Sequence, residues 1–467
     1  MTGAVLLVLP VGIPWVLAAV LALVDGRKRW VGLLASAGLG ASLVSLGFLI
    51  SEVLREGSVE VVSGGWPIGV GISLRADALG VTFAAVSVGV ILVSTLYEVS
   101  LGIRWRVFPA LVLLVAAGLN GLFLTGDAFN FYVFFEVSMT ASFVLAGYRE
   151  EDYQVRAAFL FAVVNLLGSV VFLIGIAALY SITGSLDMEM ISARAEGLDP
   201  SSVIVIAAVI FAAFCLKLGL FPFHFWLPAV YVGSHAPVAA ILSGALANIG
   251  SYGILRFGAG VLPRELELGS VAVMALGAAS IVYGGLQAIS RRDTSEVMAY
   301  SAIGQVGYIL LAVGVGAPVG YAAATLYSVV NSLNKGVVFL AAGLRGPLVG
   351  GAFAVGAFSI AGVPPAAGFV GKIAAFKAAL TADPPLASLA FVVLIFAGSA
   401  LSFLYAFQVY QRRFMKPDPE ANAKPSPRAA RFLVVALAAL VVMAGLWPEP
   451  LVYLSEAAAA VLTEGPG

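Results

Sequence analysis

Charged residues and cysteine are both scarce in this sequence. Only 11% of the residues are charged and 61% are hydrophobic, a balance that soluble proteins do not show. The 25 basic residues match the 25 acidic ones, so the basic patch that a nucleic acid requires is not expected. The one cysteine, Cys215, can form neither an internal disulfide nor a thiolate metal cluster. The composition therefore predicts a membrane protein that has no nucleic-acid partner and carries no redox cofactor.

Long apolar stretches recur along the whole chain. Each is long enough to cross about 30 Å of hydrocarbon, which takes roughly 20 helical residues. They are apolar on all sides, which indicates helices packed on lipid and on each other and excludes barrel strands. The first stretch lacks the basic region and cleavage site of a signal peptide, so we expect it to be retained. The predicted fold class is an all-α membrane protein with about fourteen spans. They are 4–24, 31–50, 76–97, 107–125, 128–148, 157–181, 202–222, 236–257, 269–289, 297–316, 318–344, 351–376, 387–411 and 430–447.

The loops between these spans differ in basic charge. Cytoplasmic loops of membrane proteins carry the excess of Lys and Arg. One set of loops holds sixteen basic residues and the other set holds six, so both termini are predicted to face outward. The larger set is Arg27, Lys28, Arg29, Arg104, Arg106, Arg149, Arg156, Arg291, Arg292, Arg345, Arg412, Arg413, Lys416, Lys424, Arg428 and Arg431. The smaller set is Arg55, Arg75, Arg194, Arg256, Arg264 and Lys377.

Four charged residues fall inside predicted spans and away from the span ends, namely Glu136, Lys217, Lys335 and Lys372. Each charge at a helix centre costs about 2.5 to 3.5 kcal/mol, so each needs a partner or a use. One interpretation is structural, with a Glu136–Lys217 ion pair and with the other two lysines reaching an interface. The other is a proton relay, because a buried lysine gives up its proton readily and a movable carboxylate can load it again.

Two of these lysines stand next to residues that break helices. Lys217 begins the sequence KLGLFP, and Lys372 ends the sequence GVPPAAGFVGK. Helix breaks at membrane depth are tolerated only where the freed backbone faces protein or water, and paired breaks are typical of transporter ion sites. An ordinary proline kink is the alternative at either place. The repetition, each time with a lysine, favours discontinuous helices.

Five stretches resemble a known family. They are FNFYVFFE (129–136), KLGLFPFHFWLP (217–228), HAP (235–237), YSAIGQVGY (300–308) and NKG (334–336). In these the chain is similar to the antiporter-like subunits of respiratory complex I, membrane-bound hydrogenases and Mrp-type Na⁺/H⁺ antiporters. The resemblance implies fourteen helices, with two inverted five-helix repeats and with the seventh and twelfth helices broken. It divides the chain into 1–106 (helices 1–3), 107–257 (first repeat), 258–411 (second repeat) and 412–467 (basic loop, last helix and tail).

The resemblance also assigns roles to residues. Glu136 and Lys217 match the family's glutamate and lysine pair, and Lys335 and Lys372 match the charged residues of its eleventh and twelfth helices. Asn248 stands where the family usually has a lysine or histidine, so the relay either passes through water held by the amide or is interrupted there. Tyr327 and Asn331 likewise replace histidines that often precede the eleventh-helix lysine.

The remaining polar residues have simpler interpretations. His224 and His235 lie beside prolines between two spans, where a titrating gate and a plain loop role are both open. Asp77, Asp127 and Asp293 stand near span ends and are predicted to be interfacial or capping groups. No phosphate loop, metal-ligand spacing or nucleophile constellation is found in the sequence.

The sequence leaves three functions open. The first is a proton-translocating subunit of a multisubunit prokaryotic inner-membrane complex, most like the D-type subunit of an Mrp antiporter. Its partners would be other membrane subunits and protons, and Na⁺ transport is left open. The second is a membrane-arm subunit of an NADH:quinone oxidoreductase or a hydrogenase, in which partner subunits hold every redox centre. The third is a scaffold that moves no ions.

Overall fold

The protein is helical almost throughout, which confirms the predicted class. A computed structural model describes residues 3–67, 71–148, 151–316, 318–382, 385–415 and 427–464. Among these residues, eleven helical segments are long and apolar enough to cross a membrane. The first helices are α1 (Gly3–Ala22), α2 (Arg29–Glu56), α3 (Ala78–Leu101), α4 (Phe108–Phe123), α5 (Ala128–Ala146), α6 (Asp152–Thr183), α7 (Met188–Ala195), α8 (Pro200–Leu218) and α9 (Leu227–Gly233). The next form the continuous helical segment Ala236–Val261, made of α10 (Ala236–Ile241), the π-helix η2 (Leu242–Leu246), α11 (Asn248–Gly253) and the π-helix η3 (Ile254–Val261). The last are α12 (Pro263–Ser290), α13 (Thr294–Val315), α14 (Val319–Ala342), α15 (Pro347–Ala361), α16 (Ala367–Leu380), α17 (Pro385–Tyr410), the π-helix η4 (Gln411–Met415), α18 (Arg428–Leu446) and α19 (Glu449–Glu464).

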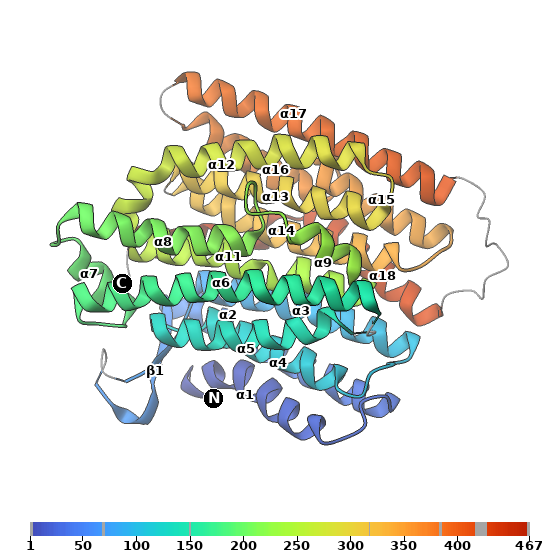
Figure 1. The fold of residues 1–467 in the computed structure, drawn as a ribbon, viewed down its shortest axis with the longest axis horizontal. Helices are drawn as coiled ribbons and strands as arrows, with labels where there is room; N and C mark the ends of the chain where they lie inside the picture. Colours follow the sequence, from blue (N-terminus) through green and yellow to red (C-terminus); the bar gives the residue numbers. More distant parts are fainter. Residues whose placement is uncertain are drawn as a thin grey trace.

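The long helices lie side by side along the longest axis of the molecule (Figure 1). The N and C marks both lie toward the left of this view, and the end of α17 and the start of α18 lie to the right. At the right-hand end the Gly26 backbone N–H donates to the Arg106 carbonyl at 2.9 Å, and the Arg412 guanidinium donates to the Arg291 carbonyl at 3.0 Å. Loops of the more basic set therefore contact each other at one end of the helices.

Two helices are interrupted at the predicted breaks. α8 ends before Gly219, which has a φ of 62°, and α9 begins only at Leu227; α15 ends before Gly362, which has a φ of 83°. The backbone groups freed there find partners inside the protein. The Trp226 indole N–H donates to the Leu216 carbonyl at 3.1 Å, and Ser359 Oγ accepts from the Gly368 N–H at 2.9 Å. Buried backbone groups need such partners because water does not reach them.

The three aspartates that the sequence placed near span ends each begin a helix, as the capping interpretation predicted. Asp77, Asp127 and Asp293 each accept a hydrogen bond from the backbone N–H three residues later, at 2.9, 2.6 and 2.9 Å. Such an N-cap satisfies a donor that the helix itself cannot pair. Asp77 also binds Arg256 Nη2 at 2.6 Å. Its carboxylate thereby ties the start of α3 to the helix Ala236–Val261.

Three elements were not predicted. Residues 58–77 contain an antiparallel hairpin of β1 (Ser58–Val62) and β2 (Ser73–Asp77), and α7 follows α6 at the same, left-hand end (Figure 1). The third is α19, because the C-terminal tail expected after the last predicted span is helical over residues 449–464. Its acids Glu449 and Glu456 are exposed, while its small residues Ala458 and Ala459 are buried. Packing of this small-residue face, which a hydropathy scan does not register, stabilises the helix.

The break before α16 gives a test of local stability. An alanine at Gly362 would adopt a left-handed φ, and its Cβ would lie 2.7 Å from Lys372 Cδ. We expect Gly362→Ala to lower the free energy of unfolding by about 1 to 2 kcal/mol. Gly351 is the control. It lies within α15, the helix that ends just before Gly362, and the space around its Cβ position is open. Gly351→Ala should therefore leave stability unchanged or raise it slightly. Thermal unfolding of the purified protein in detergent measures both, and equal midpoints would contradict this account.

Candidate functional site

Lys217 is held at the end of α8 by polar atoms of α6. Its side chain is buried, with 8% of the residue exposed. Nζ donates to the Asn165 carbonyl at 2.9 Å and to Ser169 Oγ at 3.4 Å, and it lies 4.1 Å from the centre of the Phe135 ring. The ammonium therefore has two hydrogen-bond acceptors and an aromatic face. These groups are neutral, and the two acceptors would also accept a hydrogen bond from a neutral amine.

Glu136 follows Phe135 on α5 and is partly buried. Its Oε1 is buried without a hydrogen-bond partner among the described residues, and no ion pair at 4.0 Å or closer joins it to Lys217 in that part of the chain. The ion pair of the structural interpretation is therefore not formed in the described part of the chain. The expectation that the two groups are coupled stays a prediction.

A small cavity lies next to Lys217. It has a volume of about 20 Å³, and its lining includes Asn165 and Lys217 on one side and Leu246, Ala247 and Ile249 on the other. A volume of this size can hold about one water molecule where polar groups are present. The cavity thus reaches from the lysine to the two neighbours of Asn248.

Asn248 bridges three helices. Its Nδ2 donates to Ser87 Oγ of α3 at 3.0 Å and to the Gly244 carbonyl at 3.3 Å, and its Oδ1 accepts from Ser332 Oγ of α14 at 2.9 Å. The residue lies between the two π-helical segments η2 and η3. Departures of this kind from regular α-helix are frequent at functional sites. The Asn248 side chain therefore connects the helix beside the Lys217 cavity to α3 and α14.

Lys335 lies on α14 three residues after Ser332, one helical turn away. Its exposed fraction is 4%, so its amine is deep in the protein. Two amide oxygens of the same helix, Asn331 Oδ1 and Asn334 Oδ1, are buried and accept no hydrogen bond from the described residues. These two oxygens can accept hydrogen bonds from a water molecule that carries a proton near this lysine.

Lys372 is held across the second break by α13 and α17. Nζ donates to Ser399 Oγ at 2.8 Å and to the Tyr308 hydroxyl at 3.4 Å, and it lies 4.6 Å from the centre of the Tyr308 ring. The residue is 3% exposed. All of these partners are neutral, as the hydrogen-bond partners of Lys217 are.

A chain of hydroxyl and amide groups continues from Tyr308. Its ring stacks on Tyr327 at 5.2 Å, and the Tyr327 hydroxyl donates to Gln305 Oε1 at 2.5 Å. Gln305 Nε2 in turn donates to the Tyr405 hydroxyl at 3.3 Å, which shares a hydrogen bond with Ser301 Oγ at 2.7 Å. Ser301 lies in the second turn of α13, whose start follows the basic loop at residues 291 and 292. Tyr327, expected only as a substitute for histidine, is thus part of a network that leads from Lys372 toward the basic end.

His235 lies at the basic end of the helices and contacts a buried acid that the predicted spans left out. Its Nε2 lies 3.5 Å from Glu98 Oε2, and the Tyr148 hydroxyl donates to Glu98 Oε1 at 2.7 Å. Glu98 is 1% exposed. It lies on α3, which extends to Leu101, whereas the predicted span ends at residue 97. The count of a single acid within the spans was therefore wrong. A longer predicted span, which the apolar residues Val99 and Leu101 allow, would have found it.

The other histidine takes part in a separate contact. His224 Nε2 lies 2.8 Å from the Tyr283 hydroxyl of α12, in the break between α8 and α9. Among the described residues no group of three or more His, Cys, Asp or Glu side chains could hold a metal ion. The described site is therefore a set of three buried amines, with amide and hydroxyl groups near each of them and a small cavity beside Lys217. Such groups can orient water molecules that transfer protons.

Comparison with known proteins shows the family that the sequence motifs indicated. A family model for the transmembrane part of NADH:quinone oxidoreductase and Mrp antiporters matches residues 125–346. The D-type subunit of the Na⁺/H⁺ antiporter of Alkalihalophilus pseudofirmus is 31% identical in an alignment of 472 positions, which covers 96% of this chain and 94% of that protein. Its counterpart in Bacillus subtilis is 28% identical and covers 97% of both chains.

Solved structures agree. A chain of the Mrp complex from Dietzia sp. has a TM-score of 0.90 at 28% identity, and covers 99% of this chain and 98% of its own. A chain of respiratory complex I from Thermus thermophilus has a TM-score of 0.77 at 26% identity, with 95% and 98% coverage. The fold and its buried lysines thus define an antiporter-like membrane subunit. The chain belongs to the family of D-type subunits of Na⁺/H⁺ antiporters, within the wider group that includes complex I membrane subunits.

Proposed function

We propose that this chain is a proton-translocating subunit of a multisubunit inner-membrane Na⁺/H⁺ antiporter of the Mrp type. The observation that carries the proposal is the series Lys217, Asn248, Lys335 and Lys372, all buried and all in contact with neutral hydrogen-bonding groups or next to them. Similarity over nearly the whole chain to D-type subunits of such antiporters supports it. The other subunits of the complex would then be its partners.

Each residue has a role in this proposal. The Glu136 carboxylate stabilises the charged form of Lys217 and burial favours the neutral form, so a change in their separation loads or releases a proton. A water in the adjacent cavity carries the proton toward Asn248, and water oriented by the Asn248 amide and by Ser332 passes it on to Lys335. Lys372 and the network from Tyr308 to Ser301 connect the relay to the basic end. His235 with Glu98 forms a second titratable pair there.

The arrangement of spans is also part of the proposal. If α8 joins α9, α15 joins α16, α18 joins α19 and Ala236–Val261 counts once, then the helices apart from α7 make fourteen crossings. The family's two inverted five-helix repeats would fall in 107–257 and 258–411. We place the basic end in the cytoplasm and both termini outside, because the basic loops contact each other at one end.

A membrane-arm subunit of an NADH:quinone oxidoreductase is the second candidate. The TM-score of 0.77 to a chain of complex I supports it, but the value of 0.90 to a chain of the Mrp complex favours the antiporter. A scaffold that moves no ions is the third candidate. It does not need the lysines to titrate, and substitution of one of them can therefore exclude it.

Substitution of Lys217 tests the relay. We expect Lys217→Ala to lower cation-dependent proton movement in vesicles by about 100-fold or more, a typical loss for a proton-transfer group. Lys217→Arg should also fail, because arginine keeps its charge and cannot release a proton. The exposed loop residue Lys28 is the control, and Lys28→Ala should transport normally. If Lys217→Arg transports at the normal rate in an assembled complex, the lysine is structural and the relay proposal fails.

Cysteine labelling tests the orientation. Glu60 on the hairpin and Arg292 between α12 and α13 are both exposed, and the native Cys215 is buried. We expect an impermeant maleimide to label Glu60→Cys in intact cells and Arg292→Cys only after permeabilisation. The reverse pattern would place the basic end outside and overturn the assignment.

A further inference from the structure

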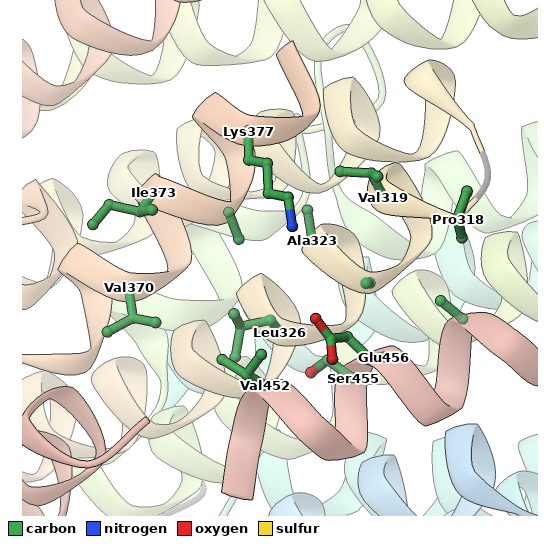
Figure 2. A pocket seen from close by; sticks show the side chains of 13 residues that line it. Pro318, Val319, Ala323, Leu326, Val370, Ile373, Lys377, Val452, Ser455 and Glu456 are labelled. Carbon is green, nitrogen blue, oxygen red and sulfur yellow. The ribbon is translucent and has the colours of Figure 1, made fainter. Parts of the chain in front are cut away.

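A cleft of about 410 Å³ opens between α14, α16 and α19, apart from the buried lysines (Figure 2). Its walls are mostly apolar, with Leu326 of α14, Val370 and Ile373 of α16 and Val452 of α19 among the lining residues. Its volume lies in the range of small-molecule sites, about 300 to 1,000 Å³. An apolar cleft of this size on helices that lie in a membrane is accessible to a lipid chain.

Two opposite charges enter this apolar cleft. Figure 2 shows Lys377 of α16 and Glu456 of α19 pointing into it from opposite walls. Neither forms an ion pair at 4.0 Å or closer with any residue in the described ranges. Exposed charges on facing walls, held apart, are complemented by an occupant that carries both an anion and a cation.

The polarity of the cleft also changes along the helices. Lys377 lies three residues before the end of α16, or about 5 Å at the rise of an α-helix, and Pro318 stands just before α14. In Figure 2 the apolar side chains Val370 and Ile373 lie on the side of the cleft opposite Pro318. The charged part is therefore near the helix ends and the apolar part extends toward the interior of the membrane, which is the polarity gradient of a phospholipid.

We propose that this cleft binds one zwitterionic phospholipid with a primary-amine headgroup. Its phosphate accepts hydrogen bonds from the Lys377 ammonium, its own ammonium binds the Glu456 carboxylate, and an acyl segment lies along Leu326 and Val370. A partner helix with two matching charges is the competing occupant. The phospholipid is favoured because its headgroup carries both charges on one molecule and the bilayer supplies it at high concentration.

Native mass spectrometry of the purified complex, delipidated and then titrated with dioleoyl phosphatidylethanolamine or dioleoyl phosphatidylglycerol, tests the proposal. Lys377→Gln should weaken retention of the most tightly bound phosphatidylethanolamine by about tenfold or more, the usual effect of losing a hydrogen bond to a charged group. Glu456→Gln should remove the preference for phosphatidylethanolamine over phosphatidylglycerol, because only the former offers an ammonium.

A second pair of variants tests the cleft without changing a charge, and its control shows whether an added phenylalanine disturbs the fold. Ala322→Phe fills the cleft and should remove the same lipid, whereas Val282→Phe, on an exposed position of α12, should retain it. Unchanged lipid binding in both Lys377→Gln and Ala322→Phe would overturn the proposal. So would a photo-crosslink from position 322 to another protein of the assembled complex, since that protein would then fill the cleft. This experiment measures lipid binding and not transport, so its outcome is independent of whether the proton relay operates.

Discussion

Backbone polar groups at membrane depth must find their partners inside the protein, and the arrangement of this chain depends on that requirement. Lipid offers no hydrogen bonds, so an interrupted helix is stable only where side chains replace the lost backbone contacts. Trp226 and Ser359 do this at the two breaks. The breaks in turn allow Lys217 and Lys372 to be held by side chains and carbonyls of neighbouring helices. The contacts that stabilise the interrupted helices therefore also position the buried lysines.

Lys217 and Lys372 both have neutral hydrogen-bond partners. A fixed ion pair would lock each lysine in its charged state, because separating two buried charges is costly. Hydroxyls, carbonyls and aromatic faces instead stabilise the ammonium moderately and also tolerate the amine. Glu136 follows Phe135, whose ring faces Lys217, and its Oε1 has no hydrogen-bond partner among the described residues, so a displacement of the carboxylate would change the balance between the two states. A site with these properties can change its protonation without unfolding the helices around it.

The sequence alone predicted the features that depend on local pattern. The charges within apolar runs located the lysines, the Gly and Pro clusters located both breaks, and aspartates before apolar runs located three helix starts. It did not predict the contacts of Asn248 with Ser87 and Ser332, because these join segments 161 and 84 residues apart. Glu98 was missed because the predicted span ends one residue too early, and α19 because packing of its alanines stabilises it more than hydropathy indicates. Tertiary partners, and not local propensity, determine these parts.

Proton transport by two asparagine variants is the most direct test of the central claim that the relay passes through Asn248. Asn248→Leu keeps the number of side-chain heavy atoms and their branching but removes the amide between Ser87 and Ser332. Asn120 is a matched control, because it is similarly buried and its amide donates to the Pro10 carbonyl and to Ser42, away from the lysines. The account predicts that Asn248→Leu abolishes transport in vesicles, that Asn248→Lys sustains it, and that assembled Asn120→Leu transports normally. Normal transport by Asn248→Leu would contradict the account.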